Sequence, residues 1–346
     1  MKLSDYDYEL PKELIAQFPL DRRDTSNLMV LNRENKTLHH KKFFDIADYL
    51  SENDVLAVNN TKVFPARLIG KKSTGANIEI FLLEKKTEKT WHALIKPAKR
   101  VKEEMEIFFS EKLKAKILSR EEEDKWKIEL IYEGNFEEIL NETGEAPLPP
   151  YINRNQRDQN TKRLDCQRYQ TVYAQNTGSV AAPTAGLHFT EEIFNKLKEK
   201  NVEICSVSLN VGLGTFKPVR VENIFDHKMD NEHYEIPENT AKIIKKAKDT
   251  GKNIVAVGTT TTRALETAFN SNGELLSSSG YSNLFIYPGY EFKIINKLTT
   301  NFHLPCSTLL MLVSAFAGKD YVFHAYAEAI KNKYRFYSYG DCMFIF

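Results

Sequence analysis

The sequence contains few cysteines and no long apolar run, and both absences limit where the protein can work. The four cysteines lie far apart and form no C-x-x-C pair, at positions Cys166, Cys205, Cys306 and Cys342. We therefore expect a reduced, cytoplasmic protein. The most apolar stretch, residues 309–317, is much shorter than the roughly 20 residues that span a bilayer, so it predicts a buried helix and no membrane association. The first 20 residues carry acids and a proline where a signal peptide would be apolar.

Several common catalytic motifs are also missing. The chain has no G-x-x-x-x-G-K-[ST], no complete G-x-G-x-x-G and no G-x-S-x-G, which argues against P-loop NTPases, kinases and typical dehydrogenases. His227 and His233 have acids nearby, but their spacing matches no zinc pattern, so we expect no metal. The formal net charge of +1 excludes a polycation, although 48 Lys and Arg residues leave room for a local basic face.

The hydrophobic pattern changes character along the chain and predicts two domains. From 67 to 147, apolar and polar residues alternate in five or more short runs, which is typical of antiparallel strands and favours a small barrel. Runs of this kind include Ile78, Ile80 and Leu82; Trp91, Ala93 and Ile95; and Leu113, Ala115 and Ile117. On either side, strands alternate with helices. We therefore predict an α/β main domain formed by residues 1–66 and 148–346, with an inserted antiparallel β-barrel at 67–147.

The α/β part contains clear local signals for individual elements. Strands are expected at 54–61, running into a polar turn, at 202–216, ending in a glycine turn, and at 253–258 and 284–290. Helices are expected at 192–200, 237–253, 307–318 and 321–333, the second with a proline near its start and Gly251 at its end. Thr190 should be the N-cap of the first helix, and Ser307 or Thr308 that of the third.

The stretch GSVAAPTAGLHFT, residues 178–190, is unusual for a core segment. Its small residues would let a ligand approach the backbone closely. His188, two residues before the expected N-cap, is suited to accept or donate a proton. A packed turn with a hydrogen-bonded histidine explains the same stretch about equally well.

Two further segments place small or hydroxyl residues after a strand. VGLGTF, residues 211–216, resembles part of a dinucleotide loop, but two glycines alone are a weak signal and a strand bulge is the simpler explanation. GTTTTRALE, residues 258–266, begins a helix whose N-terminus could bind an anion or carboxylate, or could simply be capped by its own hydroxyls. Arg263 gains nothing from the helix dipole there, which mildly favours a binding role.

Two polar segments are less specific. Asn301 and His303 precede the apolar helix at 307–318, where a single histidine is more often structural than catalytic. Lys62 and Arg67 lie at the junction with the predicted barrel. They could contact a phosphate chain, although charged residues of this kind more often form a solvated face.

Taken in order, these segments resemble the S-adenosylmethionine:tRNA ribosyltransferase-isomerase family of queuosine biosynthesis. The resemblance covers essentially the whole chain. It rests on DYDYELPKELIAQFPLDRRDTSNLMVL, VNNTKVFPARLIG, PLPPYI, RYQTVYAQNTGSVAAPTAGLHFT, VGLGTFKPV, GTTTTRALE, TNFHLPCSTLLMLVSAFAG and YRFYSYGDCMFI. It implies an α/β domain with an inserted barrel. It also implies transfer and isomerisation of the ribosyl group of S-adenosylmethionine onto 7-aminomethyl-7-deazaguanine at the tRNA wobble position.

The resemblance also implies partners and products. Epoxyqueuosine-tRNA, adenine and methionine would form, S-adenosylmethionine would be consumed as a co-substrate, and no bound cofactor or metal would be needed. The partner would be tRNA bearing the modified base in its anticodon, and we expect a cytoplasmic monomer.

We assign site residues to this reaction as hypotheses. A base must remove a proton next to the sulfonium, and His188 is the leading candidate, followed by Glu232 and His303. Gly258, Thr259, Thr260 and Arg263 would hold the methionine carboxylate. The nucleoside pocket would be lined by Pro183, Thr184, Gly212, Gly214, Thr215 and Phe216. The tRNA phosphates would be contacted by Lys62, Arg67 and Arg335.

Two functions from other classes remain as alternatives. A methyltransferase would use the same co-substrate but would release S-adenosylhomocysteine, and the expected N-terminal glycine-rich loop is absent. A pure RNA-binding module would bind tRNA without consuming S-adenosylmethionine, and the polar segments of the α/β part argue against it.

Overall fold

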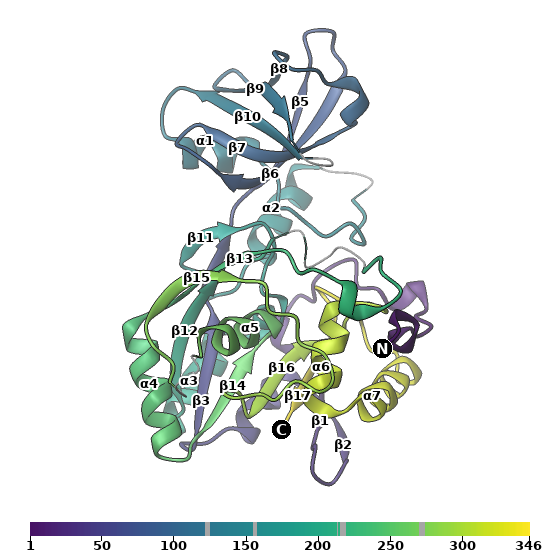
Figure 1. Cartoon of the computed structure of the whole chain (residues 1–346), viewed down its shortest axis with the longest axis vertical. Coiled ribbons are helices and arrows are strands. Elements are labelled where there is room, and N and C mark those ends of the chain that lie inside the picture. Colours follow the sequence, from purple (N-terminus) through teal and green to yellow (C-terminus); the bar gives the residue numbers. More distant parts are fainter. Residues whose placement is uncertain (122–124, 155–157, 213, 215–218, 270–273) are drawn as a thin grey trace. The chain divides into compact units, whose positions relative to one another are not determined.

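The computed structural model describes residues 1–121, 125–154, 158–212, 214, 219–269 and 274–346. The chain folds into two compact units (Figure 1). The larger comprises Met1–Lys62, Pro149–Arg154 and Gln170–Phe346, and the smaller comprises Val63–Leu148 and Asn155–Tyr169. The sequence-based boundaries assign residues 158–169 to the main domain, whereas they belong to the smaller unit here.

The smaller unit is a closed barrel of six antiparallel strands, in the order β10-β7-β6-β5-β8-β9. Its elements are β5 (Arg67–Lys71), β6 (Asn77–Lys85), β7 (Thr90–Lys96), β8 (Glu106–Ser110), β9 (Leu113–Arg120), β10 (Lys125–Tyr132), α1 (Phe136–Thr143) and α2 (Gln159–Arg168). The alternating residues Ile78, Ile80 and Leu82 are fully or almost fully buried, as period-two side chains facing the barrel interior must be.

The larger unit contains a nine-stranded mixed sheet in the order β15-β13-β12-β3-β14-β16-β17-β1-β2. Its strands are β1 (Asn27–Leu31), β2 (Leu38–Lys42), β3 (Asp54–Asn59), β12 (Glu203–Leu209), β13 (Glu232–Ile236), β14 (Asn253–Val257), β15 (Ser278–Ser282), β16 (Lys297–Asn301) and β17 (Cys342–Ile345). The central strands β12, β3, β14 and β16 are parallel neighbours. Together with the barrel, this arrangement confirms the predicted α/β fold class with an antiparallel barrel. Beside this sheet, β4 (Thr61–Val63) and β11 (Asn176–Ser179) form a two-stranded sheet.

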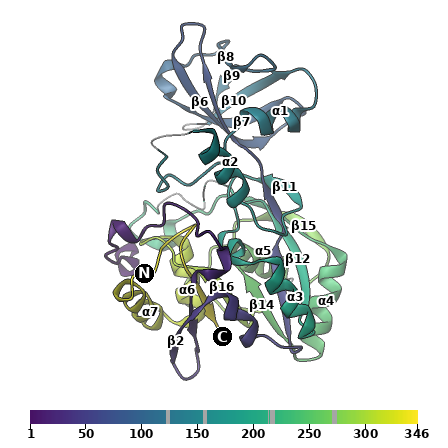
Figure 2. The same ribbon diagram turned by 180° about the vertical axis from the view of Figure 1, so that it is seen from behind.

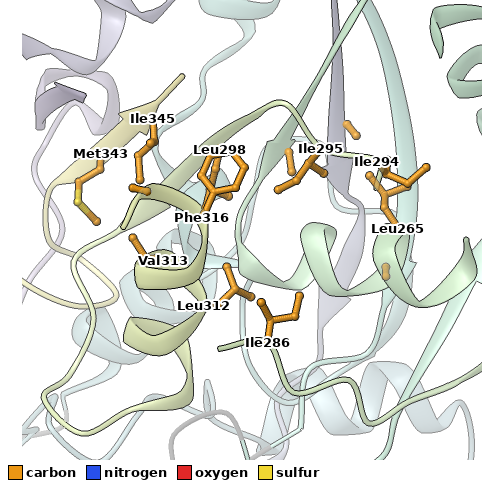
Figure 3. Packing of buried hydrophobic residues seen from close by; sticks show 14 of the residues in the cluster. Leu265, Ile286, Ile294, Ile295, Leu298, Leu312, Val313, Phe316, Met343 and Ile345 are labelled. Atoms are coloured by element: carbon orange, nitrogen blue, oxygen red, sulfur yellow. The ribbon is translucent and has the colours of Figure 1, made fainter. Parts of the chain in front are cut away.

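Helices cover both faces of the large sheet, because its strands alternate apolar residues between two cores. One core joins the sheet to α4 (Glu238–Asp249), α5 (Thr259–Ala268), α6 (Thr308–Ala317) and α7 (Lys319–Lys331), and Figure 3 shows part of it. The other joins the sheet to α3 (Glu191–Glu199) and the 3-10 helix η4 (Phe43–Tyr49), seen in Figure 2. In β1, for example, Met29 and Leu31 face the first core while Leu28 and Val30 face the second.

The predicted helices are confirmed, and one predicted strand is wrong. Thr190 caps α3 and Ser307 caps α6 through their side-chain oxygens, as expected. The expected strand at 284–290 is instead an irregular segment following β15, with a turn at Gly289. It is apolar because it covers the first core, where Ile286 is buried, and not because it pairs with another strand. No helix in the described residues has the length and apolarity that crossing a bilayer requires.

A buried carboxylate secures the loop that leads from this segment to β16. Glu266 of α5 accepts hydrogen bonds from the backbone N–H groups of Lys293, Ile294 and Ile295 at 3.0–3.2 Å, and from the Tyr290 hydroxyl at 3.1 Å. Ile294 and Ile295 in turn pack into the core (Figure 3).

We expect Glu266→Gln to lower the free energy of unfolding by about 2–3 kcal/mol, because an NH₂ group would face backbone donors in a buried site. Urea unfolding followed by circular dichroism would measure this change. The matched control is Glu238→Gln on the exposed face of α4, which breaks only a solvent-screened ion pair with Lys242. Equal effects of the two substitutions would contradict the prediction.

Candidate functional site

The candidate site lies at the carboxyl edge of the parallel strands. β3 ends at Asn59, β12 at Leu209, β14 at Val257 and β16 at Asn301, and parallel strands bring these four ends to one edge. The helix α3, in the connection from β3 to β12, packs on one face of the sheet, whereas α5, which follows the neighbouring strand β14, packs on the other. Open α/β sheets bind ligands at such a switch point, where neighbouring connections lie on opposite faces.

Asn59 ties this edge together. Its side chain is fully buried, and its Nδ2 donates to the Leu209 carbonyl at 3.0 Å and to Thr260 Oγ1 at 3.3 Å. Its Oδ1 accepts from the N–H groups of Leu209 at 3.0 Å and Thr61 at 3.2 Å. One amide therefore joins the ends of two strands to the N-terminus of α5.

The stretch 178–190 forms a wall beside that helix N-terminus. Ser179 Oγ lies 2.7 Å from Thr61 Oγ1 and accepts from Val211 N–H at 2.8 Å, which joins the stretch to β4 and to the end of β12. The 3-10 helix η6 (Thr184–His188) follows, and an added β-carbon on Gly258 would lie 3.7 Å from that of Ala185. Two segments selected from the sequence, 178–190 and 258–266, are thus neighbours.

His188 lies at the end of η6. One of its ring nitrogens makes a hydrogen bond, and the other makes none within the described residues. The ring is buried, stacks on Phe43 with centroids 4.9 Å apart, and places Nδ1 2.7 Å from Ser26 Oγ. Ser26 Oγ donates to the Arg23 carbonyl at 3.3 Å, so it accepts from Nδ1–H. Nε2 makes no hydrogen bond within the described part of the chain and therefore presents a lone pair.

Burial lowers the pKa of His188 to about 4, because the imidazolium loses its hydration. The side chain of Asn301 and the backbone of Arg23 raise the pKa, whereas the charges of Arg23 and Arg335 lower it further. The ring is therefore neutral near pH 7 and able to accept a proton at Nε2.

Further buried polar atoms also lack partners among the described residues. They include Oδ1 of Asn301, Oγ1 of Thr299 on the same strand, and one terminal nitrogen of Arg335, Nη1. Asn301 is oriented by its Nδ2, which donates to the Tyr337 carbonyl at 2.9 Å and leaves Oδ1 without a bond. Buried polar atoms are usually satisfied by protein or water, so this group of atoms suits a polar ligand.

Asp341 fixes the residues on both sides of His188. Its buried carboxylate accepts from the N–H of Asn27 at 2.8 Å, from the Asn27 side chain at 2.9 Å and from the N–H of Arg335 at 2.8 Å. Burial raises the pKa of this carboxyl group. Asn27 follows Ser26 in the chain, so one side chain positions both Ser26 and Arg335. No local sequence pattern marks Asp341 or Ser26 as a site residue.

Glu232 and Arg263, considered separately in the sequence, form a buried ion pair on the β13 side of the edge. Both side chains are under 5% exposed, and Arg263 Nη1 contacts Glu232 Oε2. Arg263 also donates to the carbonyls of Leu284 at 3.0 Å and Ser282 at 3.4 Å, while Glu232 Oε1 accepts from Gly212 N–H at 3.0 Å. The pair therefore holds the glycine loop after β12, and both groups are engaged before any substrate binds.

His303 is separated from His188 by β16. Its Nε2 lies 2.8 Å from Thr300 Oγ1, and its backbone bonds to the hydroxyls of Tyr326 and Tyr8. Thr300 faces the opposite side of the strand from Asn301, because side chains alternate. His303 is thus part of the packing on the other face, and burial lowers its pKa to about 3.

The remaining residues expected to line the substrate pocket lie on α5, at the start of η6 and in the loop after β12. Thr259 and Thr260 begin α5, and Pro183 precedes Thr184 at the start of η6. Gly214 lies against Asp230, where an added β-carbon would come 2.2 Å from Oδ2. Two other residues assigned to the pocket lie outside the described residues, namely Thr215 and Phe216.

The residues expected to contact tRNA phosphates differ in their surroundings. Lys62 is exposed. Arg67, in the smaller unit, pairs with Glu79 and approaches Glu145 at 3.9 Å, so carboxylates already compensate its charge. Arg335 is half-buried near His188, and burial lowers the pKa of its guanidinium. Arg335 therefore lies beside the histidine site.

Stability should fall as the pH is lowered from about 6.5, the ordinary histidine pKa, toward 4. In this interval the unfolded chain protonates His188 and His303, whereas the folded protein keeps them neutral. Each histidine then contributes up to about 1.4 kcal/mol of lost stability per pH unit. Urea unfolding between pH 7 and pH 4.5 measures the slope. Unchanged or rising stability on acidification would contradict the prediction.

Comparison with known proteins gives three consistent matches. A family model described as "Queuosine biosynthesis protein" matches residues 3–345. The S-adenosylmethionine:tRNA ribosyltransferase-isomerase of Clostridioides difficile (strain 630) is 52% identical over 348 residues, covering 100% of both proteins. The crystal structure of S-adenosylmethionine tRNA ribosyltransferase from Thermotoga maritima is 39% identical and matches with a TM-score of 0.57, covering 99% of this chain and 100% of that one.

Proposed function

Because the chain belongs to the queuosine biosynthesis protein family and is an enzyme of the S-adenosylmethionine:tRNA ribosyltransferase-isomerase type, we propose a specific reaction for it. It transfers and isomerises the ribosyl group of S-adenosylmethionine onto 7-aminomethyl-7-deazaguanine at the tRNA wobble position. The products are epoxyqueuosine-tRNA, adenine and methionine. S-adenosylmethionine is a consumed co-substrate, and the enzyme acts as a monomer in the cytoplasm.

The observation that carries this proposal is the open Nε2 of His188 in a buried site at the switch point. The sulfonium of S-adenosylmethionine acidifies the protons on the adjacent 5′ carbon, so a neutral base can remove one of them. The C–H bond breaks, its electron pair stays on carbon, and the proton moves to Nε2. Asn301 Oδ1 is placed to accept a hydrogen bond from the new N–H, and Ser26 continues to accept from Nδ1–H.

The neighbouring segments support binding of the rest of S-adenosylmethionine. The first N–H groups of α5 have no partner within the helix, so the backbone at Thr259 and Thr260 suits the methionine carboxylate. The wall formed by Pro183 and Thr184, together with the loop containing Gly212 and Gly214, would enclose the nucleoside. Glu232 and Arg263 would act by holding that loop, since each already bonds to the other.

The reaction is tested by incubating the protein with S-adenosylmethionine and tRNA that carries 7-aminomethyl-7-deazaguanine. Chromatography with mass detection identifies the small molecules released. Adenine and methionine that form only with the modified tRNA are the expected result. S-adenosylhomocysteine would identify a methyltransferase instead, and tRNA binding without any consumption of S-adenosylmethionine would indicate a binding module.

A further inference from the structure

An exposed aromatic ring lies next to the histidine site without a role in the reaction described above. Phe18 is 54% exposed, and the Arg154 guanidinium lies over its ring, 4.5 Å from the centroid. A phenylalanine that is half in water contributes little to the core. The pair instead presents a flat ring and a guanidinium together, the two groups that stack on nucleobases.

The pair is held in place by a network of backbone and amide bonds. Arg154 donates to the Gln17 carbonyl at 2.9 Å, Asn153 N–H donates to Gln17 Oε1 at 2.8 Å, and Gln17 Nε2 donates to the Tyr151 carbonyl at 2.9 Å. These bonds connect two segments that are more than 130 residues apart in sequence. The ring is therefore supported as a preorganised surface, which lowers the entropy lost on binding.

The same network leads directly to His188. The carbonyl of Phe18 accepts a hydrogen bond from Arg335 Nη2, while Nη1 of this guanidinium has no partner in the described chain and its charge acts on His188. A single arginine side chain thus connects the backbone of Phe18 with the surroundings of the proposed base. An RNA base bound on the ring would be close to a nucleotide reacting at His188.

Several arginines, together with acids, lie around the ring. Arg22, whose side chain is 72% exposed, and Arg23 lie on the same N-terminal segment, and Arg154 and Arg335 flank it. The acids of the segment are Asp21 and the buried Asp24, which pairs with Arg22. Glu192 also acts on Arg22 and Asp341 acts on Arg335, so acids partly compensate these charges. The feature that favours a nucleobase is therefore the exposed ring with the Arg154 guanidinium over it.

We propose that Phe18 and Arg154 form a stacking platform for an unpaired nucleobase of the tRNA anticodon loop, beside the nucleotide that is modified. This inference rests on the proposed function, because it takes tRNA as the partner. Sequence-specific enzymes that act on RNA bases commonly hold splayed bases against aromatic rings and guanidinium planes. The platform would let a protein with a net charge near zero bind the anticodon loop through local contacts.

The test measures binding of an anticodon stem-loop RNA by fluorescence anisotropy, with Phe18→Ala, Phe18→Trp and Phe225→Ala beside the wild-type chain. Phe18→Ala should weaken binding about tenfold, the usual range for loss of one stacked base, and Phe18→Trp should restore it. Phe225 is the matched control, because it is also a phenylalanine with 54% exposure but lies elsewhere in the unit. Equal affinities for the wild type and Phe18→Ala would overturn the platform.

Steady-state kinetics distinguish failure of the platform from failure of the proposed reaction. We expect Phe18→Ala to raise KM for the modified tRNA about tenfold, with little change in KM for S-adenosylmethionine. An active enzyme whose Phe18→Ala variant keeps the wild-type KM for tRNA would overturn the platform and leave the reaction standing. RNA binding that depends on Phe18, without adenine release from any tRNA, would overturn the reaction and support the platform.

Discussion

His188→Gln should lower kcat for adenine release by about 10³-fold, within the range usually lost with a general base. Glutamine keeps the polar character of the side chain and can still bond to Ser26, but it cannot take up a proton near pH 7. Binding of S-adenosylmethionine and of tRNA should change little, because the lost interaction is with a proton that moves only during the reaction. Single-turnover kinetics with saturating substrates measure this step.

The matched control is His303→Gln, which changes the other buried histidine with a strongly lowered pKa. His303 lies on the opposite face of β16 and bonds to Thr300, so we expect its substitution to reduce stability while leaving kcat within a few-fold of wild type. Near-normal turnover by a folded His188→Gln variant would remove His188 from the reaction. Loss of activity in His303→Gln alone would exchange the two assignments.

Glu232→Gln should destabilise the larger unit by about 3–5 kcal/mol, the usual cost of breaking a buried ion pair from one side. The substitution leaves the buried Arg263 guanidinium without a negative partner, and one amide oxygen replaces the two carboxylate oxygens that accept from Arg263 and from Gly212 N–H. Urea unfolding gives the change in free energy. The double variant Glu232→Gln/Arg263→Met should be less destabilised than the sum of its single variants, because the uncompensated charge is gone.

Lys242→Met provides a control for this pair. Lys242 and Glu238 form an exposed ion pair one helical turn apart, and solvent screening makes its loss nearly neutral. If Glu232→Gln unfolds at the same urea concentration as the wild type, the buried pair is not a structural element. Glu232 would then be available as a base, and Arg263 would be available to the methionine carboxylate.

Much of the fold could be predicted because local sequence patterns specify its strands and helices. The barrel strands alternate apolar residues with period two, and each helix of the larger unit has a capping residue or an apolar face that marks it. The segment 284–290 was wrongly predicted to be a strand, because an apolar run indicates burial but does not show whether the backbone pairs with a neighbouring strand. Ile286 packs on the core from an irregular segment, a difference that depends on tertiary context.

The site was only partly predictable for the same reason. His188 could be selected from the composition of its own segment, and the ends of parallel strands are a known place for ligands. Its partners come from far away, since 162 residues separate Ser26 from His188 and 314 separate Asn27 from Asp341. Arg335 was expected at a phosphate, yet its contacts in the fold place it beside the histidine. No local signal encodes such a contact.

Single-turnover release of adenine from S-adenosylmethionine, either unlabelled or deuterated at the 5′ carbon, tests most directly whether His188 removes the proton that starts ribosyl transfer. The wild type should release adenine more slowly from the deuterated compound, because a C–H bond breaks in the step. His188→Gln should release adenine about 10³-fold more slowly than the wild type. Equal rates for both compounds, together with a wild-type rate for His188→Gln, would contradict the assignment of His188 as the base.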